Sequence, residues 1–508
     1  MKFQAIKGVR DILPPESALW NRVEQTAREV FATYGFGEIR LPTFELARLF
    51  EHSIGDETDI VTKELYFWID SPQANRALRS IRAKAIENAY RAIHDDQNVR
   101  VELFKQAEAG SFDTLNKANL LCLRPEATAS VCRAYIENEM HTLPGNVKLY
   151  YIGPMFRRER PQKGRYRQFY QIGAEVLGQS DAPAIDAEVI EMLMHFFARA
   201  GLSGKGASPA NVVAGFSPAS QVAGTVEKHA DLKVVATGAD GTTLYINSIG
   251  CKDCRPKYVA ELKAALEKVR DKLGPDSQRR IETNPLRVLD SKLPEEQAVI
   301  EKLPRITEHL CEACRDHYTE VKKQLALRGV VFLENGRLVR GLDYYMRTTF
   351  EITAPGLGSQ NAVCGGGRYD GLVELLGGPP TKGIGFAIGT DRLILSLQEA
   401  EKLKTGEHVG PPLRLDVFVA WMGTTSQPVA VNMAQKLRAA GFSVEVPAEE
   451  MKFKKSIGLA DKLGARFALI IGENEIAEGK FALKRLADGY QESFSEAELL
   501  AHMKSQQK

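Results

Sequence analysis

Two strand-like runs between Lys148 and Gly178 limit the fold more than any other stretch of the sequence. The runs KLYYIGPMF and RQFYQIGAEVLG flank the segment RPQKGR, whose Pro161 and Gly164 favour an extended hairpin loop. Strands joined in this way pair antiparallel. The chain is therefore predicted to contain an antiparallel sheet that includes this hairpin.

The second strand of the hairpin has one apolar face and one polar face, because side chains alternate along a strand. The apolar face carries Tyr170, Ile172, Ala174 and Val176. The polar face carries Arg167, Phe169, Gln171, Gly173 and Glu175. Glu175 could pair with a substrate ammonium group, and Gln171 could orient a polar ring or amide. The polar face predicts a wet pocket, with a sheet face open to solvent as the alternative.

Six basic side chains lie within the twelve residues from Phe156 to Arg167. The chain of 508 residues has a net charge of only +2, so attraction for a polyanion must come from such local patches. Arg157, at the end of the first strand, could make a bidentate contact with a phosphate group. An exposed charged hairpin is the alternative.

A second phosphate-binding element is predicted in GIGFAIGTDRLIL, from Gly383 to Leu395. Its three glycines keep the strand's surface free of side chains, as a flat ligand lying against the sheet requires. Thr390 or Asp391 can cap the following helix, which puts Arg392 in the first turn, where the helix dipole disfavours a cation. An anion bound in front of Arg392 would explain why a cation stands at this position. A surface arginine without a ligand is the alternative.

Three further motifs supply polar or bare surfaces. RLVRGLDYYMRTTFEI contains Arg340 and the pair Tyr344 and Tyr345, which point to opposite faces if the segment is extended, one into the pocket and one into the core. LRPEATA adds Glu126 and Thr128, and GGGRYDGL adds a bare backbone surface. The sequence contains neither G-x-x-x-x-G-K-[ST] nor G-x-G-x-x-G, so ATP would bind on the antiparallel sheet between arginines.

The length suits several domains, and 44% hydrophobic and 26% charged residues are typical of a globular protein. We expect a cytoplasmic protein without a membrane span, since no window approaches eighteen apolar residues and the N-terminus lacks a signal-peptide core.

The segment HVGPPLRLDVFVAW marks a domain boundary, after which strands and helices alternate as in a small βαβ domain. A charged stretch at 71–115 is predicted to be a helical surface insertion, with an RNA-binding arm as the alternative.

Two cysteine pairs, Cys251/Cys254 and Cys311/Cys314, have the C-x2-C spacing of a four-thiolate zinc site. Seven cysteines in a chain without an export signal favour free thiols or metal ligands over a disulfide framework. The sequence leaves Zn²⁺ and reduced thiols without metal as the alternatives.

Several of these motifs together resemble the class II aminoacyl-tRNA synthetases. GFGEIRLPTFE is similar to their motif 1, FRRE and RYRQFYQIGAEVLG to motif 2, and GIGFAIGTDRL to motif 3. LRPEATA and LVRGLDYYMRTTFEI resemble the two signatures of the histidine-tRNA ligase family, and KGVRDILP resembles that family's N-terminal start. The motifs stand in the family's order over most of the chain.

The resemblance implies a fold of the α/β class, with an α+β catalytic core. A class II antiparallel sheet flanked by helices would carry an inserted domain and a C-terminal βαβ anticodon-binding domain. The expected boundaries are 1–200 and 326–405 for the two parts of the core, 201–325 for the insertion region, and 413–508 for the anticodon-binding domain. The implied activity is ATP-dependent attachment of L-histidine to tRNA(His) through a histidyl adenylate, with release of pyrophosphate and then AMP.

The resemblance also implies roles for residues. Arg157 and Arg392 would hold the α- and γ-phosphates of ATP together with Mg²⁺, and Arg340 would be a further catalytic cation. Histidine would be bound by Glu126, Thr128, Gln171, Glu175, Tyr344 and Tyr345. The hairpin loop would meet the acceptor end of the tRNA through Gln162, Lys163 and Arg165. Motif 1 in this family implies a homodimer.

The sequence departs from the family pattern in a few places. Ala127 stands where the family usually has glycine, and Asp391 where glutamate is commoner. The stretches 71–115 and 203–240 are longer than usual. A competing interpretation is a non-catalytic paralogue, resembling the regulatory subunit of ATP phosphoribosyltransferase, but such paralogues usually lack the anticodon-binding domain and catalytic arginines. A pure RNA-binding module would not need the pocket, so the ligase is favoured.

Overall fold

The structure is a computed structural model whose described residues are 3–55, 58, 60–70, 119–202, 241–357, 361–405 and 415–505. The predicted helical insertion at 71–115 and the long stretch 203–240 lie outside them. The chain forms two compact units. The larger unit comprises residues 1–11 and 22–408, and the C-terminal unit comprises residues 12–21 and 409–508.

The larger unit is built on an eight-stranded sheet in the order β1-β5-β6-β11-β10-β9-β7-β8. Its strands are β1 (Gly37–Glu38), β5 (Val147–Phe156), β6 (Gln168–Gly178), β7 (Thr243–Ser248), β8 (Leu333–Glu334), β9 (Met346–Thr353), β10 (Ala362–Arg368) and β11 (Lys382–Gly389). The edge pairs β1/β5 and β7/β8 are parallel, and all other pairs are antiparallel. The predicted hairpin is β5 and β6, so the antiparallel sheet expected from the sequence is confirmed.

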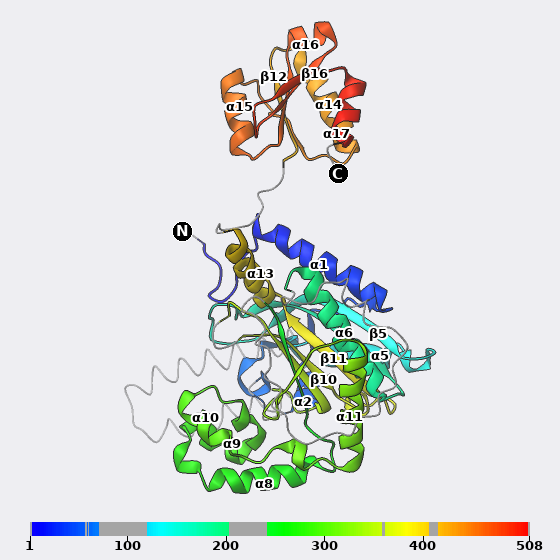
Figure 1. The fold of residues 1–508 in the computed structure, drawn as a ribbon, viewed down its shortest axis with the longest axis vertical. Helices are drawn as coiled ribbons and strands as arrows, with labels where there is room; N and C mark the ends of the chain where they lie inside the picture. The colour runs from blue at the N-terminus through cyan, green and yellow to red at the C-terminus, as the bar shows by residue number, and fades with distance from the viewer. Residues whose placement is uncertain are drawn as a thin grey trace, which may run out of the picture. The chain divides into compact units, whose positions relative to one another are not determined.

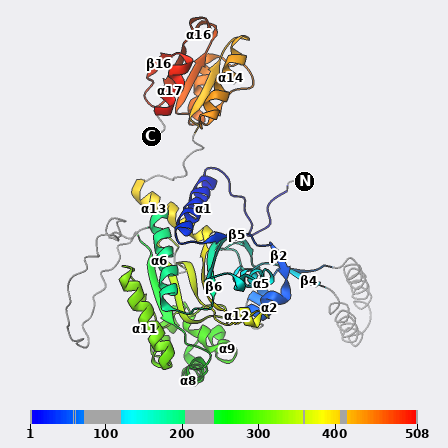
Figure 2. The ribbon, with the colours of Figure 1, turned by 90° about the vertical axis from the view of Figure 1, so that its right-hand side faces the viewer.

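Helices cover both faces of this sheet. They include α1 (Glu16–Thr33), α2 (Ala47–Ile54), α5 (Thr128–Glu137), α6 (Pro183–Ala200), α11 (Glu312–Leu327), α12 (Leu372–Leu375) and α13 (Thr390–Thr405). Figure 2 shows α6 and α11 on one side of the sheet and α5 and α12 on the other. The ring of Phe31 on α1 lies 5.5–5.9 Å from the rings of Tyr150, Phe196 and Phe386. These contacts join α1 and α6 to the apolar face of the sheet.

A helical module follows β7 and forms the lower green part of Figure 1. It contains α8 (Arg255–Glu267), α9 (Pro275–Thr283) and α10 (Pro294–Ile300) around its own core, which includes Tyr258 and Ile281. The insertion region expected at 201–325 is longer than this module. Strand β7 pairs with β9, and its Leu244 and Ile246 are buried, so the core sheet continues past residue 201.

A small sheet in the order β2-β4-β3 lies beside the large one in the chain's N-terminal part. It consists of β2 (Phe44–Leu46), β3 (Phe67–Asp70) and β4 (Asn119–Leu123). The motif 1 segment contains β1 and the start of β2, and Pro42 lies between the two strands. Phe44, Phe67 and Trp68 are exposed on this sheet.

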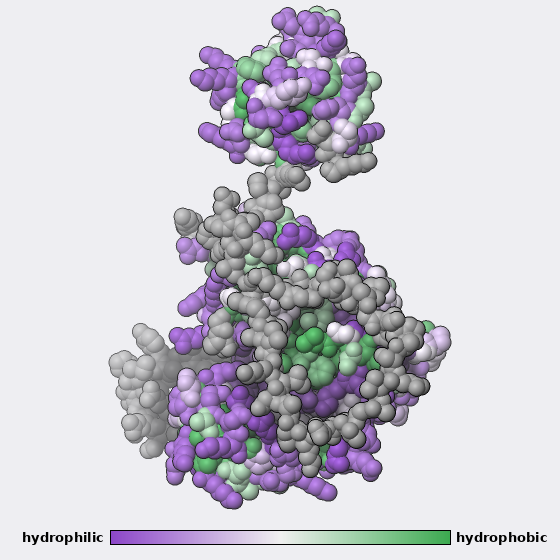
Figure 3. Space-filling view, in the orientation of Figure 1, coloured by the Kyte–Doolittle hydropathy of each residue, from purple (hydrophilic) through white to green (hydrophobic). Residues whose placement is uncertain are grey.

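The C-terminal unit is a five-stranded sheet, β13-β12-β14-β15-β16, with helices on both faces. Its elements are β12 (Val417–Trp421), α14 (Ser426–Ala439), β13 (Val444–Glu445), α15 (Phe453–Lys462), β14 (Phe467–Ile471), α16 (Glu473–Glu478), β15 (Phe481–Arg485), β16 (Gln491–Phe494) and α17 (Glu496–Ser505). The predicted βαβ pattern is confirmed by the parallel pairs β12/β13 and β12/β14. The antiparallel β15/β16 hairpin was not predicted. The face of this unit seen in Figure 3 is mostly hydrophilic.

None of the described helices combines the length and the apolar character needed to cross a membrane.

Candidate active site

An open cavity of about 700 Å³ lies against the glycine-rich strands of the large sheet. Its lining comes from the β5–β6 hairpin, from β10 and β11, from the segment at 339–345, and from the helical module. We define two sets of predicted site residues here. The acidic end consists of Glu126, Thr128, Gln171, Tyr344 and Tyr345, which line the cavity, and of Glu175, which is buried behind the lining. The arginine end consists of Arg157, Arg165, Arg340 and Arg392.

The acidic end is a closed hydrogen-bond network. Glu126 accepts from the backbone N–H groups of Thr128 and Ala129, at 2.6 and 3.0 Å, because it precedes the first turn of α5. The Thr128 hydroxyl donates to Oε1 of Glu175 at 2.8 Å, and the Tyr369 hydroxyl donates to Oε2 at 2.6 Å. Both oxygens of Glu175 therefore have a fixed donor, and the carboxylate cannot rotate freely.

Glycine on β11 makes room for this network. Gly385 pairs with Glu175 across the sheet, and a Cβ atom at Gly385 would lie 1.6 Å from Oε2 of Glu175. Gly365 on β10 has the same role at the arginine end, since its Cβ would lie 2.0 Å from Nη2 of Arg340. The bare strands expected from GIGFAIG and GGGRYDGL thus hold side chains from neighbouring segments against the sheet.

Burial raises the pKa of Glu175 to about 8, an effect that the Tyr369 and Thr128 hydroxyl groups reduce and the charge of Glu126 increases. Burial likewise raises the pKa of Glu126. Among the described residues, Oε1 of the buried Gln171 has no hydrogen-bond partner. The acidic end therefore contains two carboxyl groups that a cation would stabilise in their charged form, beside an amide oxygen that can accept from a ligand.

The positions of Tyr344 and Tyr345 differ from the expectation for an extended segment, which was that one side chain points into the pocket and the other into the core. Residues 341–344 form bends and a turn, and β9 begins only at Met346. Because the segment is not extended, the rings of Tyr344 and Tyr345 lie 4.8 Å apart and both line the cavity. Tyr345 also packs into the core of the module.

The arginine end brings four guanidinium groups to one cavity. Arg157 donates to the carbonyl of Pro125 at 3.0 Å and lies over the ring of Phe169. Arg392, in the first turn of α13, donates to the carbonyls of Gly164 and Ala362. Burial lowers the pKa of Arg392, and the positive charge of Arg165 lowers it further. Such crowding of cations is typical of an anion-binding site.

Three of these arginines have carboxylate partners. Arg340 pairs with Glu351 at 3.0 Å, Arg165 pairs with Glu159 at 3.3 Å, and Arg157 pairs with the same Glu159 at 3.8 Å. Gln162 and Lys163 belong to the same hairpin loop as Arg165 but are not part of the cavity lining. Asp391, a candidate helix cap, instead accepts from Arg10 and from the backbone N–H of Tyr170.

Some lining residues were not found from the sequence. The module contributes Arg280, Arg287 and Lys292, which bring more positive charge to the cavity. Sequence reasoning also misses Tyr369, which donates to Glu175 and lies outside the lining. The basic residues in α9 and in the segment before α10 are a signal for the first three, whereas the contact of Tyr369 depends on the order β10–β11–β6 in the sheet.

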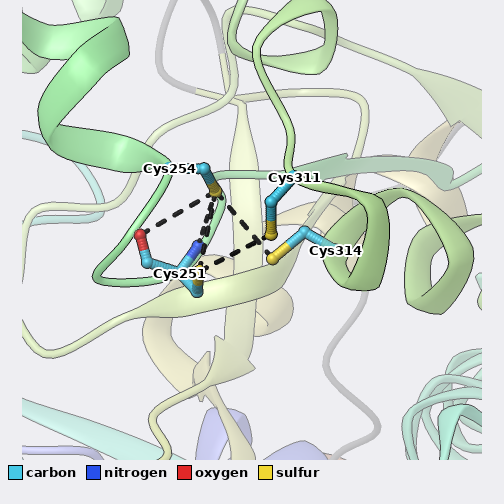
Figure 4. Close-up of side chains that lie close together, drawn as sticks. All are labelled: Cys251, Cys254, Cys311 and Cys314. Carbon is cyan, nitrogen blue, oxygen red and sulfur yellow. Dashed lines mark hydrogen bonds between the residues drawn. The ribbon is translucent and has the colours of Figure 1, made fainter.

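The four cysteines of the two C-x2-C pairs converge, as Figure 4 shows. Their sulfur atoms all lie within 4.8 Å of one another, with separations of 3.7 Å for Cys251–Cys254 and 3.9 Å for Cys251–Cys311 and Cys254–Cys314. A tetrahedral Zn²⁺ site with Zn–S bonds of about 2.3 Å has sulfur atoms about 3.8 Å apart. Disulfide bonds are excluded at these distances, since they need about 2.05 Å.

A Gly-rich strand leads into a helix whose first turn contains Asp391 and Arg392, and an antiparallel hairpin next to it brings an arginine to the same cavity. This arrangement defines a class II aminoacyl-tRNA synthetase. The histidyl-tRNA synthetase family model matches residues 106–207 and 256–393, and an anticodon binding domain model matches 416–506. The chain belongs to the histidyl-tRNA synthetase family, as its relatives also show.

Curated proteins named histidine–tRNA ligase from Koribacter versatilis and Solibacter usitatus are 44% and 43% identical, over 99% of this chain and 96% and 99% of theirs. The crystal structure of apo histidyl-tRNA synthetase from S. aureus is 30% identical and has a TM-score of 0.68, covering 99% of this chain and 100% of that one. These relatives confirm the predicted family, fold class and ligase activity.

A Bacillus halodurans structure titled ATP phosphoribosyltransferase regulatory subunit/histidyl-tRNA synthetase is 17% identical, with a TM-score of 0.54 over 93% of this chain and 99% of that one. At that identity it shares the fold alone.

Proposed function

We propose that the cavity forms histidyl adenylate, with histidine at the acidic end and ATP at the arginine end. The observation that carries the proposal is that both ends open into one space of about 700 Å³. That volume lies in the range of small-molecule sites. Two substrates bound side by side react with an entropic advantage over free encounter.

Histidine supplies an ammonium group and an imidazole ring, which are the two kinds of group that the acidic end can bind. The buried Glu126 and Glu175 provide negative charge, and the free acceptor on Gln171 can meet a ring N–H. The aromatic rings of Tyr344 and Tyr345 enclose a flat side chain. We assign histidine binding to the whole acidic end on these grounds.

At the arginine end, a histidine carboxylate oxygen attacks the α-phosphorus of ATP, and the bond from this phosphorus to the oxygen of the β-phosphate breaks. Pyrophosphate leaves with the electron pair. Arg157 and Arg340 are assigned to the charge that builds up on the α-phosphate, and Arg392 to the γ-phosphate. Mg²⁺, when bound with ATP, would neutralise further phosphate charge.

In the second step, a terminal ribose hydroxyl of the tRNA attacks the carbonyl carbon of the adenylate, and AMP leaves. We assign the acceptor contact to Gln162, Lys163 and Arg165, because their loop adjoins Arg392 through the carbonyl of Gly164. The anticodon-binding domain, residues 413–508, is assigned to the other end of tRNA(His).

We also propose that Cys251, Cys254, Cys311 and Cys314 bind one structural Zn²⁺. The support is that three of the six sulfur separations, at 3.7–3.9 Å, agree with the tetrahedral value of about 3.8 Å, and that all six are within 4.8 Å. Four protein thiolates would close the coordination sphere, so this ion would have no part in catalysis.

The exposed Phe44, Phe67 and Trp68 of the small sheet are proposed to lie in a homodimer interface, since the rings of Phe44 and Trp68 already form one apolar patch, 6.0 Å apart. Sedimentation analysis of a Trp68→Glu variant tests the interface, and a wild-type chain that sediments as a monomer would contradict it.

We propose the cytoplasm as the site of action because ATP and tRNA occur there together.

The first experiment is histidine-dependent exchange of pyrophosphate into ATP by the purified chain, without tRNA and with the other amino acids as controls. Exchange with histidine alone is expected. Histidine binding without exchange would instead favour the non-catalytic paralogue. The tRNA step is then tested by charging of tRNA(His).

A further inference from the structure

We propose that Arg255 is a positioning residue for histidine recognition: it transmits the geometry of the zinc-holding cysteine cluster to the tyrosine pair of the acidic end. The inference rests on the histidine and zinc sites proposed above. It adds a role to the module that contains the cluster, because the ion would then fix substrate affinity as well as the local fold.

Arg255 follows directly after Cys254 and begins helix α8. Its guanidinium group donates to the carbonyl of Ile249 at 3.1 Å, to that of Gly250 at 3.3 Å, and to that of Tyr345. One planar side chain therefore binds the loop that carries Cys251 and the backbone of a pocket tyrosine. Lysine could not reproduce this fork of donors.

Two backbone hydrogen bonds reinforce the same connection. The N–H of Ile249 donates to the carbonyl of Arg347, and the N–H of Arg347 donates to the carbonyl of Gly250, both at 2.8 Å. Arg347 has a φ of +50°, a left-handed conformation that residues other than glycine rarely adopt. The register of β9 and β10 shifts between Thr349 and Met346, so the strand is irregular where it follows the two tyrosines. Irregularities of this kind next to active sites redirect side chains.

The cysteine loop has little freedom of its own. Gly250 has a φ of +69°, and a Cβ atom there would lie 2.7 Å from the sulfur of Cys254. The other two thiols lie at the start of α11, which packs against α6 of the core. Cys251, Cys254, Cys314 and Tyr345 share one hydrophobic core. An ion that ties the two pairs together would therefore hold the loop, and through Arg255 the tyrosines, in a single position.

The test compares three variants with wild-type full-length chain, measuring zinc content by mass spectrometry and KM for histidine and for ATP by pyrophosphate exchange. Arg255→Lys removes the fork and leaves all four thiols. Arg315→Lys is the matched control: Arg315 follows Cys314 as Arg255 follows Cys254, but within the described ranges its guanidinium group donates only to the carbonyl of Leu310. Cys311→Ala removes one ligand.

We expect one zinc ion per chain in the wild type and in both arginine variants. Arg255→Lys should raise the KM for histidine roughly tenfold, since a small displacement of a positioning contact has effects of that order or larger, and should change the KM for ATP less than twofold. Arg315→Lys should match the wild type. Cys311→Ala should lose the ion and show the same histidine-selective defect.

The proposal is overturned if Arg255→Lys leaves the KM for histidine unchanged, if both KM values rise equally, or if active wild-type chain contains no zinc. Because Arg255→Lys keeps every ligand, it tests the idea even if Cys311→Ala does not fold. Absence of histidine-dependent exchange in the wild type would instead contradict the proposed function itself.

Discussion

The two ends of the cavity are built differently. At the acidic end, Glu175 is 1% exposed and both of its oxygens accept from hydroxyl groups of the protein. At the arginine end, the side chains of Arg157 and Arg340 are 21% and 22% exposed. The nitrogen–oxygen distance between Arg157 and Glu159 is 3.8 Å. Among the described residues, the guanidinium group of Arg392 donates hydrogen bonds to backbone carbonyl groups alone.

The difference indicates a division of work. A buried network whose donors are fixed can reject ligands of the wrong shape, because each misplaced polar group is left unpaired. Partly exposed cations can exchange their protein partners for phosphate oxygens and act on charge that appears only in the transition state. Substitutions at the arginine end should therefore lower turnover, and substitutions at the acidic end should lower histidine affinity.

The largest expected effect is that of Arg340→Ala on turnover. We expect adenylate formation to fall roughly 10³-fold, while the dissociation constant for histidine changes less than threefold, since the cation stabilises developing charge. Single-turnover adenylate formation and calorimetric histidine binding measure the two quantities. Arg337→Ala is the control, because Arg337 lies in the same segment but bonds to Gln297 and Glu301 of the module. A large loss of histidine affinity with unchanged turnover would contradict this role and show that Arg340 mainly binds histidine.

The second prediction uses two glycines of β11 that lie at opposite ends. A Cβ at Gly385 would collide with Glu175, whereas a Cβ at Gly389 would meet Cδ of Arg392 at an ordinary 3.8 Å. Gly385→Ala should raise the KM for histidine roughly 100-fold by displacing Glu175, and Gly389→Ala should change either KM less than threefold. Pyrophosphate exchange at varied histidine and ATP measures both, with circular dichroism to confirm folding. Equal effects of the two variants would mean that the acidic end tolerates repacking.

The sequence predicted the parts of the site that lie within single motifs. The β5–β6 hairpin, the alternation that places Gln171 and Glu175 together, and Arg392 in the first helical turn all follow from local periodicity. The bare strand at GIGFAIG follows from composition. These features are local because strand geometry fixes which face each side chain occupies.

The rest required the packing of distant segments. Tyr369 reaches Glu175 only because β10 lies next to β11 and β11 next to β6. Tyr344 and Tyr345 lie side by side because a turn replaces the expected strand, and that turn is held by contacts to the cysteine loop. The place of β7 in the core sheet also depends on a partner, β9, that is about a hundred residues away in the chain.

The third prediction concerns the loss of one hydroxyl group from the hydrogen-bond network at the acidic end. Tyr369→Phe removes the donor at 2.6 Å from Oε2 of Glu175 and keeps the ring. A buried polar atom that loses its hydrogen-bond partner costs about 1–3 kcal/mol, so we expect the KM for histidine to rise about tenfold at unchanged KM for ATP. Tyr135→Phe, in the same hydrophobic core, serves as the control. If Tyr369→Phe binds histidine normally, the hydroxyl group has only a packing role.

The smallest expected effect is the pH dependence of histidine binding, which isolates the charge of Glu175. Its pKa is raised to about 8, so below that pH the carboxyl group of the ligand-free protein is mostly protonated, and it must lose the proton before it can bind a cation. The ionised fraction, and with it the affinity, should rise about fivefold between pH 7 and pH 8 and level off above that. Calorimetric titration of the wild type and of Glu175→Gln over this range measures the ratio of their dissociation constants, from which the titration of histidine itself cancels. A ratio that does not change with pH would show that Glu175 binds histidine through hydrogen bonds alone. The negative charge that distinguishes the acidic end from the arginine end would then come from Glu126 alone.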